Sequence, residues 1–165
     1  MCRDGRITEK LESPCLAIEK EQKLIDIGNK IAPHAIWEKY DITNIKEVSK
    51  MLEKHSHKYD QIIANPPWEL AYWVIYLSYQ LLKINPSSYM IMLLPCDYFT
   101  STKKRRDIFH EMNIHIVKEY LVCRWNYLEY DTKTAPRIGT DAIFVISIHK
   151  GITQPVMYET EWLFP

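Results

Sequence analysis

Short apolar runs alternate with amphipathic stretches along most of the chain. Leu24, Ile27 and Ile31 show the spacing of one face of a helix, whereas Ile62-Ile63-Ala64 is a short continuous apolar run typical of a buried strand. The runs predicted to be strands are 15–18, 35–40, 60–64, 88–94, 115–123 and 141–149. The stretches predicted to be helices are 20–31, 69–83, 102–112 and a segment that Thr43 or Asn44 would cap. This alternation predicts an α/β fold with a doubly wound, mostly parallel sheet.

The last two predicted strands have no helix between them, so we expect an antiparallel hairpin at one edge of the sheet. The other strands are apolar on both faces, which is typical of a sheet covered by helices on both sides. The length of 165 residues suits one domain, 1–165, in which the tail 152–165 has no clear pattern.

Polar residues follow three of the predicted strands. Glu19, Asp41 and Asn65-Pro66-Pro67-Trp68 come where those strands end. Ligands of open α/β sheets bind at the carboxyl ends of the strands. One carboxylate can accept hydrogen bonds from ribose hydroxyls and another from an adenine amino group, so the pattern suits a nucleoside. For Asp41 alone, a helix-capping role is the better explanation, and it is the three strand ends together that favour a ligand site.

The Asn65-Pro66-Pro67-Trp68 motif is the most specific signal in the sequence. Two prolines at a strand end favour a rigid, extended corner without N–H donors. The Asn65 side chain and the Pro66 carbonyl can then both accept hydrogen bonds from one amino group, and Trp68 can stack on a planar base. The alternative is a pair of prolines that ends a strand before a tryptophan of the core.

With this motif the chain resembles the class I S-adenosylmethionine-dependent methyltransferases that carry an (N/D)PP(Y/F/W) motif and methylate amino groups. The resemblance implies a Rossmann-like fold with Asn65, Pro66, Pro67 and Trp68 at the catalytic position. It further implies that S-adenosylmethionine is bound by the residues that match the family's cofactor motifs, namely Asp4, Gly5, Glu19, Asp41, Ile42 and Asn65. The segment Gly139-Thr140-Asp141-Ala142 is similar to phage-encoded members of the group.

The implied activity is direct methyl transfer to an exocyclic amine, with adenine N6 in DNA as the expected substrate. A duplex substrate would have to flip its base into the site, where Trp68 would stack on it. RNA and protein glutamine are the other substrates known for this motif.

The first motif of the family is incomplete in this sequence. Only Met1 precedes Cys2-Arg3-Asp4-Gly5, so the family's central first strand is missing. Either a longer product supplies the strand, or a partner chain or the C-terminal tail fills its place, or cofactor binding is lost. In the last case we expect a degenerate methyltransferase fold that acts as a binding or inhibitory module.

The charge of the chain changes this picture little. Lys plus Arg and Asp plus Glu are both 21, which excludes a strongly basic nucleic-acid binder. Lys103-Lys104-Arg105-Arg106 is the one basic run, and it suits either phosphates or a solvated helix face. The aromatic segment 125–130 suits base stacking, packing on the hairpin, or a contact with a second copy or a partner protein.

The remaining features concern location and metals. The four cysteines form no metal-binding or disulfide pattern, so we expect reduced thiols in a cytoplasmic protein, in a host cell if the gene is viral. No apolar run is long enough to cross a membrane. His55 and His57 lack suitably spaced partners, so no metal site is expected.

Overall fold

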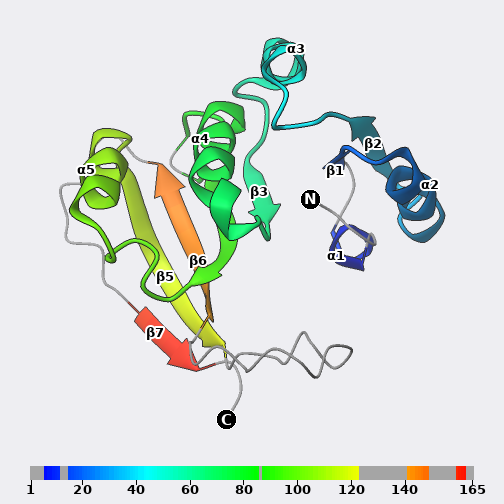
Figure 1. The fold of residues 1–165 in the computed structure, drawn as a ribbon. Coiled ribbons are helices and arrows are strands. Elements are labelled where there is room, and N and C mark those ends of the chain that lie inside the picture. The colour runs from blue at the N-terminus through cyan, green and yellow to red at the C-terminus, as the bar shows by residue number, and fades with distance from the viewer. Residues whose placement is uncertain (1–5, 12–14, 86, 123–140, 149–158, 163–165) are drawn as a thin grey trace, which may run out of the picture. The chain divides into compact units, whose positions relative to one another are not determined.

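The computed structural model describes residues 6–11, 15–85, 87–122, 141–148 and 159–162 (Figure 1). The chain divides into two compact units, an N-terminal unit of Met1–Ser56 and a C-terminal unit of His57–Pro165. Each unit is described by itself below.

Among its described residues, the N-terminal unit contains two parallel strands and three helices. Helix α1 (Arg6–Glu9) is followed by β1 (Cys15–Glu19), α2 (Gln22–Ile31), β2 (Ala35–Lys39) and α3 (Ile45–His55). Strands β1 and β2 pair in parallel from Cys15 opposite Ala35 to Glu19 opposite Lys39, and α2 is the crossover between them. The predicted strands and helices of this part of the sequence are therefore confirmed.

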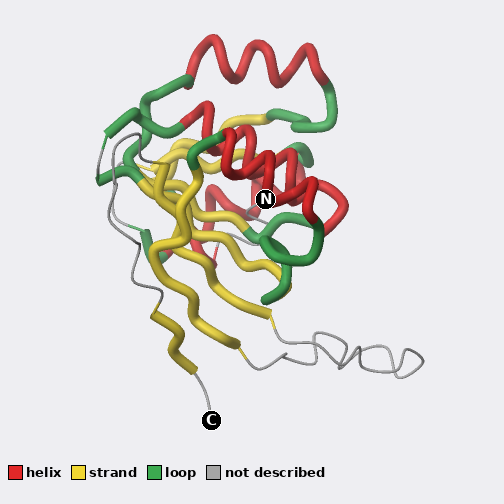
Figure 2. The backbone as a smooth tube through the Cα atoms, turned by 90° about the vertical axis from the view of Figure 1, so that its left-hand side faces the viewer, coloured by secondary structure: helices red, strands yellow, loops and turns green. Residues whose placement is uncertain are grey.

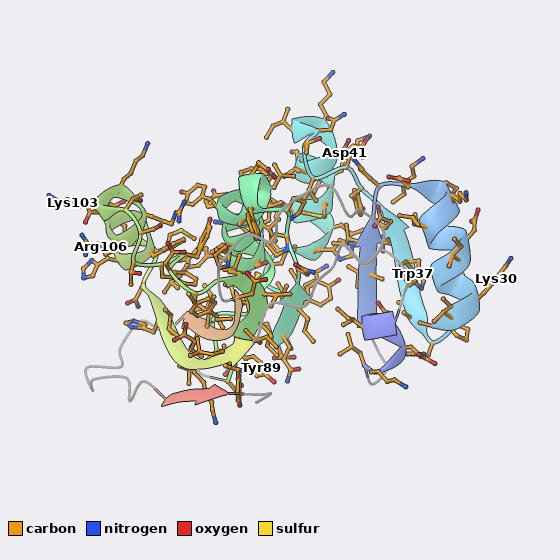
Figure 3. All side chains as sticks on the ribbon, turned by 60° about the horizontal axis from the view of Figure 1, so that its bottom comes forward. Lys30, Trp37, Asp41, Tyr89, Lys103 and Arg106 are labelled. Carbon is orange, nitrogen blue, oxygen red and sulfur yellow. The ribbon has the colours of Figure 1, made fainter. Side chains whose placement is uncertain are left out.

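Helix α2 lies against β2 through an unusually close contact at Gly28. A Cβ atom added there would lie 2.3 Å from the indole of Trp37 in β2. The Trp37 indole N–H donates to the Ala32 carbonyl at 3.3 Å, just beyond the end of α2. Figure 3 shows Trp37 between the strand and the helix. The glycine thus lets a large aromatic side chain fill the space between α2 and β2.

Helix α3 begins as the sequence predicts, and Asn44 rather than Thr43 is its cap. The Asn44 side chain accepts a hydrogen bond from the Lys46 N–H at 3.0 Å. This bond satisfies one of the amide groups that the first turn of a helix leaves unpaired.

The C-terminal unit is built on a five-stranded sheet with the order β3-β4-β6-β5-β7. Its elements are β3 (Gln61–Ala64), the 3-10 helix η1 (Trp68–Leu70), α4 (Ala71–Leu81), β4 (Tyr89–Pro95), α5 (Lys103–Glu111), β5 (Ile114–Val122), β6 (Asp141–Ile148) and β7 (Glu159–Trp162). Figure 2 shows these strands side by side. Strand β6 pairs antiparallel with both neighbours, whereas β3 pairs in parallel with β4 and β5 with β7. A mostly parallel sheet with an antiparallel portion is confirmed.

The expected position of the antiparallel pair at one edge is wrong. Strand β6 lies between β4 and β5, and β5 pairs on its other side with β7, so neither strand of the antiparallel pair is an edge strand (Figure 1). The pattern of apolar residues shows which strands are buried, but it does not show which strand is the neighbour of which.

The C-terminal tail, which has no clear hydrophobic pattern, contributes β7. This strand pairs with β5 from Lys118 opposite Glu159 to Leu121 opposite Trp162. The tail strand therefore extends the sheet beside β5. It does not take the place of a first strand next to β3, which pairs only with β4 among the described strands.

The core of the C-terminal unit lies between its sheet and its helices. Along β4 every second side chain is buried, because alternate residues of a strand point to opposite faces. The cluster joins these residues to side chains of α4, α5 and β6, and it includes Ile75, Met90, Met92, Leu94, Phe109, Phe144 and Ile146. None of the described helices is long and apolar enough to cross a membrane.

Candidate functional site

The Asn65-Pro66-Pro67-Trp68 corner follows β3 directly. Pro66 is buried, whereas the side chain of Asn65 is exposed and that of Trp68 is 42% exposed. Pro67 has an extended backbone, with φ −55° and ψ 139°, and its carbonyl accepts from the Leu70 N–H at 2.9 Å, where η1 begins. The buried proline anchors the corner to the unit, and the residues on either side of the proline pair stay accessible.

The Asn65 amide is available to a ligand. In the part of the chain that the structure describes, no protein group hydrogen-bonds to this side chain. It can therefore use its oxygen to accept and its nitrogen to donate hydrogen bonds to a bound molecule. A tryptophan buried in the core, which was the alternative for the motif, does not fit the exposure of Trp68.

Glu19 ends β1 with a buried carboxylate that is only half satisfied. The residue is 2% exposed, and its Oε1 accepts from the N–H groups of Lys20 at 2.8 Å and Glu21 at 3.3 Å. Its Oε2 is buried and has no hydrogen-bond partner among the described residues. An unpaired buried acceptor of this kind is costly and calls for a donor such as a ligand hydroxyl.

Asp41 lies at the same edge of the two-stranded sheet as Glu19. The Glu19 carbonyl accepts from the Tyr40 N–H at 3.1 Å, so the chain leaving β2 passes the end of β1. Asp41 Oδ1 accepts from the N–H and the hydroxyl of Thr43, at 2.9 and 2.6 Å. These bonds lower the pKa of Asp41 and keep its carboxylate ionised. The helix-capping role considered for Asp41 is wrong, because Asn44 caps α3. Asp41 Oδ1 instead accepts both hydrogen bonds from Thr43 in the turn before that helix.

Glu47 supports this corner and was not singled out in the sequence. Its Oε2 accepts from the Asp41 N–H at 2.6 Å, and so holds the segment that contains Asp41 and Ile42 against α3. The spacing of Asn44 and Glu47 is that of a capping box, which is the signal that identifies such a glutamate. Here the glutamate reaches past the cap residue to an amide further upstream.

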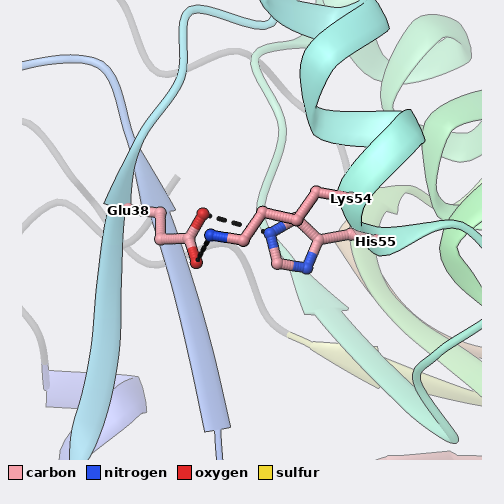
Figure 4. A network of polar contacts seen from close by, with 3 residues as sticks. All are labelled: Glu38, Lys54 and His55. Atoms are coloured by element: carbon pink, nitrogen blue, oxygen red, sulfur yellow. Dashed lines mark hydrogen bonds and ion pairs between the residues drawn. The ribbon is translucent and has the colours of Figure 1, made fainter.

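A second polar group connects β2 with α3 (Figure 4). Glu38 accepts from Lys54 Nζ at 2.8 Å, and its other oxygen lies 3.1 Å from Nε2 of the buried His55. Tyr40 lies edge-on to the His55 ring at 6.3 Å between centroids. His55 thus belongs to a structural network, and no group of metal-binding side chains is found among the described residues.

The predicted site residues fall into both units. Glu19, Asp41 and Ile42 belong to the N-terminal unit, where the first two lie at one sheet edge, and the Asn65–Trp68 corner belongs to the C-terminal unit. Asp4 and Gly5 lie outside the described residues, as do the aromatic segment 125–130 and Gly139-Thr140.

No protein-family model and no curated protein matches this sequence. Solved structures do match. A TehB-like SAM-dependent methyltransferase from Corynebacterium glutamicum has a TM-score of 0.55 and 12% identity, with 90% of this chain and 77% of that chain covered. A predicted O-methyltransferase from Agrobacterium tumefaciens has a TM-score of 0.57 and 11% identity, with coverage of 89% and 67%.

A third match is the methyltransferase subunit of a type I restriction-modification system from Streptococcus thermophilus. Its TM-score is 0.57 at 9% identity, and the alignment covers 82% of this chain but only 34% of that subunit. At such identities the likeness concerns the fold. The chain has the Rossmann-like α/β fold of S-adenosylmethionine-dependent methyltransferases, as the sequence predicts.

Proposed function

We propose that this protein is an S-adenosylmethionine-dependent methyltransferase that modifies an exocyclic amino group, and that its substrate is adenine N6 in DNA. The observation that carries the proposal is the corner after β3, where a buried proline presents the exposed Asn65 and Trp68 side chains. The methyltransferase fold of the matched structures supports the reaction class. One of those structures belongs to a restriction-modification system, which supports DNA as the substrate.

The residues of the N-terminal unit fit the nucleoside part of the cofactor. The buried Oε2 of Glu19 lacks a donor, and ribose hydroxyls are donors of suitable chemistry. Asp41 and Ile42, held by Glu47, would meet the adenine ring, and Asp4 and Gly5 would complete the site. We therefore propose that both units belong to one methyltransferase domain.

The corner would hold the amino group that is methylated. When bound, S-adenosylmethionine supplies an electrophilic methyl group. The Asn65 side-chain oxygen and the Pro66 carbonyl would each accept one hydrogen of the amine, and so aim its lone pair away from the protein towards that methyl group. Trp68 would stack on the base and fix its plane. Catalysis of this kind depends on orientation and local dipoles and requires no covalent bond to the enzyme.

The experiment uses the full chain with methyl-labelled S-adenosylmethionine and offers, in separate reactions, adenine-containing duplex DNA, the same sequence as RNA, and a glutamine-containing peptide. We expect label only in the DNA, recovered as N6-methyladenine by mass spectrometry. Asn65→Ala should lower the transfer rate by about 100-fold, and it should also weaken cofactor binding, measured by calorimetry, because Asn65 belongs to both proposed sets of contacts.

Asn29→Ala is the matched control, because Asn29 is an exposed asparagine on α2. It should transfer methyl groups at the normal rate. Label in RNA or in the peptide would replace the proposed substrate with the labelled one. Absence of cofactor binding in the folded chain would overturn the enzyme proposal and favour a binding or inhibitory module.

A further inference from the structure

Four basic residues, 103–106, begin helix α5. One of their side chains points inward and three point outward. Arg105 is half-buried, whereas Lys103, Lys104 and Arg106 are exposed. Figure 3 shows Lys103 and Arg106 projecting away from the helix. No salt bridge to these three cations is found among the described residues.

Arg105 fixes the orientation of the helix. Its Nη1 donates to the Tyr98 carbonyl at 2.8 Å and to the Ser101 hydroxyl at 2.7 Å, and its guanidinium lies 4.1 Å from the centre of the Tyr98 ring. Phe109, one turn further along α5, is buried on the same side. With Arg105 and Phe109 facing inward, the other cations of the first turn must face solvent.

A set of aromatic contacts connects α5 with Tyr72, which lies four residues after the Asn65–Trp68 corner. Tyr72 lies one helical turn after Trp68, and the two are 39% and 42% exposed. The Tyr72 ring contacts that of Phe109 at 6.2 Å between centroids, and Phe109 contacts Tyr98 at 6.3 Å. All of these residues belong to the C-terminal unit, so the corner and the basic face of α5 are positioned by one packed core.

We propose that the outer face of α5, through Lys103, Lys104 and Arg106, binds the sugar–phosphate backbone of the nucleic acid whose base enters the corner. The inference rests on the proposed function and adds the surface that holds the strand. Charge complementarity supports it, because three exposed cations, which form no salt bridge to any residue the structure describes, gather on one helix of a chain whose net charge is zero. Asp107 follows on the same helix and is exposed, so the cationic surface is confined to the first turn.

The two aromatic residues suit the same strand. Exposed aromatic rings beside a basic surface are the usual combination in proteins that bind single-stranded or flipped-out nucleic acid. Tyr72 belongs to α4, four residues after Trp68, and its ring lies 6.2 Å from that of Phe109 on α5. A strand bound to both α5 and the corner would therefore lie near Tyr72. Tyr72 would then support a base next to the methylated one.

The test measures the binding of fluorescein-labelled duplex and single-stranded DNA by anisotropy across a range of salt concentrations. The variant combines Lys103→Gln, Lys104→Gln and Arg106→Gln. Each lost phosphate contact reduces the slope of log K against log salt by about 0.9 for duplex DNA. Between 50 and 200 mM salt, the loss of DNA affinity should therefore be roughly 40-fold smaller for the variant with three lost contacts than for the wild type.

The control variant combines Lys23→Gln, Lys30→Gln and Lys50→Gln. It removes the same charge from exposed positions on α2 and α3. Its salt slope should match that of the wild type. Equal slopes for all three proteins, or a wild type that binds neither form of DNA, would overturn the proposed surface.

Methyl transfer by the same preparations separates this inference from the proposed function. A wild type that methylates DNA, together with an α5 variant of unchanged slope, refutes the surface and leaves the enzyme proposal intact. A reduced slope in a chain that transfers no methyl group supports the surface and refutes the enzyme proposal. Cofactor binding should be the same in the α5 variant and the wild type, since these cations lie on α5 and the proposed nucleoside contacts come from the N-terminal unit.

Discussion

The corner after β3 shows how two prolines keep functional side chains exposed beside a hydrophobic core. Pro66 is buried and neither proline has an N–H, so the corner leaves no buried donor unpaired. Asn65 and Trp68 flank the pair and face solvent. The sequence predicts this arrangement because the fixed φ of proline limits the chain locally, whatever packs around it.

At Gly28 we predict that substitution by alanine destabilises the fold, although alanine is the better helix former. In an exposed helix, Gly→Ala stabilises by about 1 kcal/mol. At Gly28 the added methyl would meet the Trp37 ring at 2.3 Å, so the ring must move. We expect Gly28→Ala to lower the free energy of unfolding by about 1–3 kcal/mol, measured by denaturant titration.

Ser49→Ala, at an exposed position inside α3, is the control and should change stability by less than about 0.5 kcal/mol. Trp37→Leu in the Gly28→Ala background should recover part of the loss, because it removes the ring that the methyl meets. A Gly28→Ala variant as stable as the wild type contradicts the close packing of α2 on β2.

Two neighbouring arginines on α5 should respond differently to truncation. Arg105 donates two hydrogen bonds and covers the Tyr98 ring, whereas Arg106 is exposed. We expect Arg105→Ala to cost about 1–2 kcal/mol of unfolding free energy and Arg106→Ala less than about 0.5 kcal/mol. Thermal unfolding of the two variants side by side measures this. A larger loss in Arg106→Ala contradicts the inward orientation of Arg105.

At the scale of elements, the sequence predicts the helices and strands well but not their order in the sheet. Apolar runs and caps mark where β1 to β6 lie, since these signals are local. The insertion of β6 between β4 and β5 depends on pairing between distant segments. Strand β7 in particular gives no clear signal, because Glu159-Thr160-Glu161-Trp162 lacks the apolar run of a covered strand.

The same contrast applies to the candidate site. Glu19, Asp41 and the Asn65–Trp68 corner follow strands and are visible in the sequence for that reason. The contact of Glu47 with the Asp41 N–H and the Glu38–Lys54–His55 network depend on how α3 packs against the chain around β2. The capping-box spacing identifies Glu47 as a glutamate that turns back towards the start of α3. Its actual partner, and the Glu38 network as a whole, follow from tertiary packing that residue spacing does not encode.

The Glu38–Lys54–His55 network, which joins β2 to α3, leads to a prediction about how the stability of the fold depends on pH. Partial burial raises the pKa of Glu38, but hydrogen bonds from Lys54, His55 and Tyr40 outweigh it, and the pKa lies below its ordinary value. A lowered pKa in the folded state adds stability above the ordinary pKa of glutamate, about 4.3, and that stability is lost as the pH falls through the folded value. Glu38→Gln should therefore cost about 1 kcal/mol near pH 7.

Urea unfolding of the wild type and Glu38→Gln at a series of pH values checks this. The stability difference should shrink steadily as the pH falls below about 5. Glu53→Gln, at an exposed position on α3 beside the Glu38 partner Lys54, is the control and should give a small difference at every pH. A Glu38→Gln difference that stays constant down to pH 3 contradicts the role of the ionised carboxylate.

At the scale of the whole molecule, the proposed contacts to the nucleoside of the cofactor come from one unit and the proposed substrate contacts from the other. The N-terminal unit contains the carboxylates suited to a nucleoside, and the C-terminal unit contains the Asn65–Trp68 corner, proposed to bind the amine, and the basic face of α5. Each unit has a sheet whose strand ends supply the relevant residues, which is the general way in which open α/β folds build sites. The match to methyltransferase structures, which covers about 90% of the chain, is consistent with this division.

The buried Oε2 atom of Glu19 leads to a prediction for the whole molecule. A ligand that donates a hydrogen bond to this atom must stabilise the folded chain. A ligand present at 100 times its dissociation constant adds about 2.7 kcal/mol, which for a chain of this size raises the melting temperature by about 5–10 °C. We expect S-adenosylmethionine to produce such a shift in the wild type. Glu19→Gln should fold but lose most of the shift, since its amide nitrogen cannot accept a hydroxyl hydrogen.

Glu21→Gln is the matched control, because Glu21 is exposed and only its backbone N–H contacts Glu19. Its melting temperature should rise with the cofactor as that of the wild type does. A full shift in Glu19→Gln would mean that the cofactor does not use this carboxylate. The buried Oε2 would then be a cost of folding that no ribose relieves, and the nucleoside would have to be placed elsewhere in the chain.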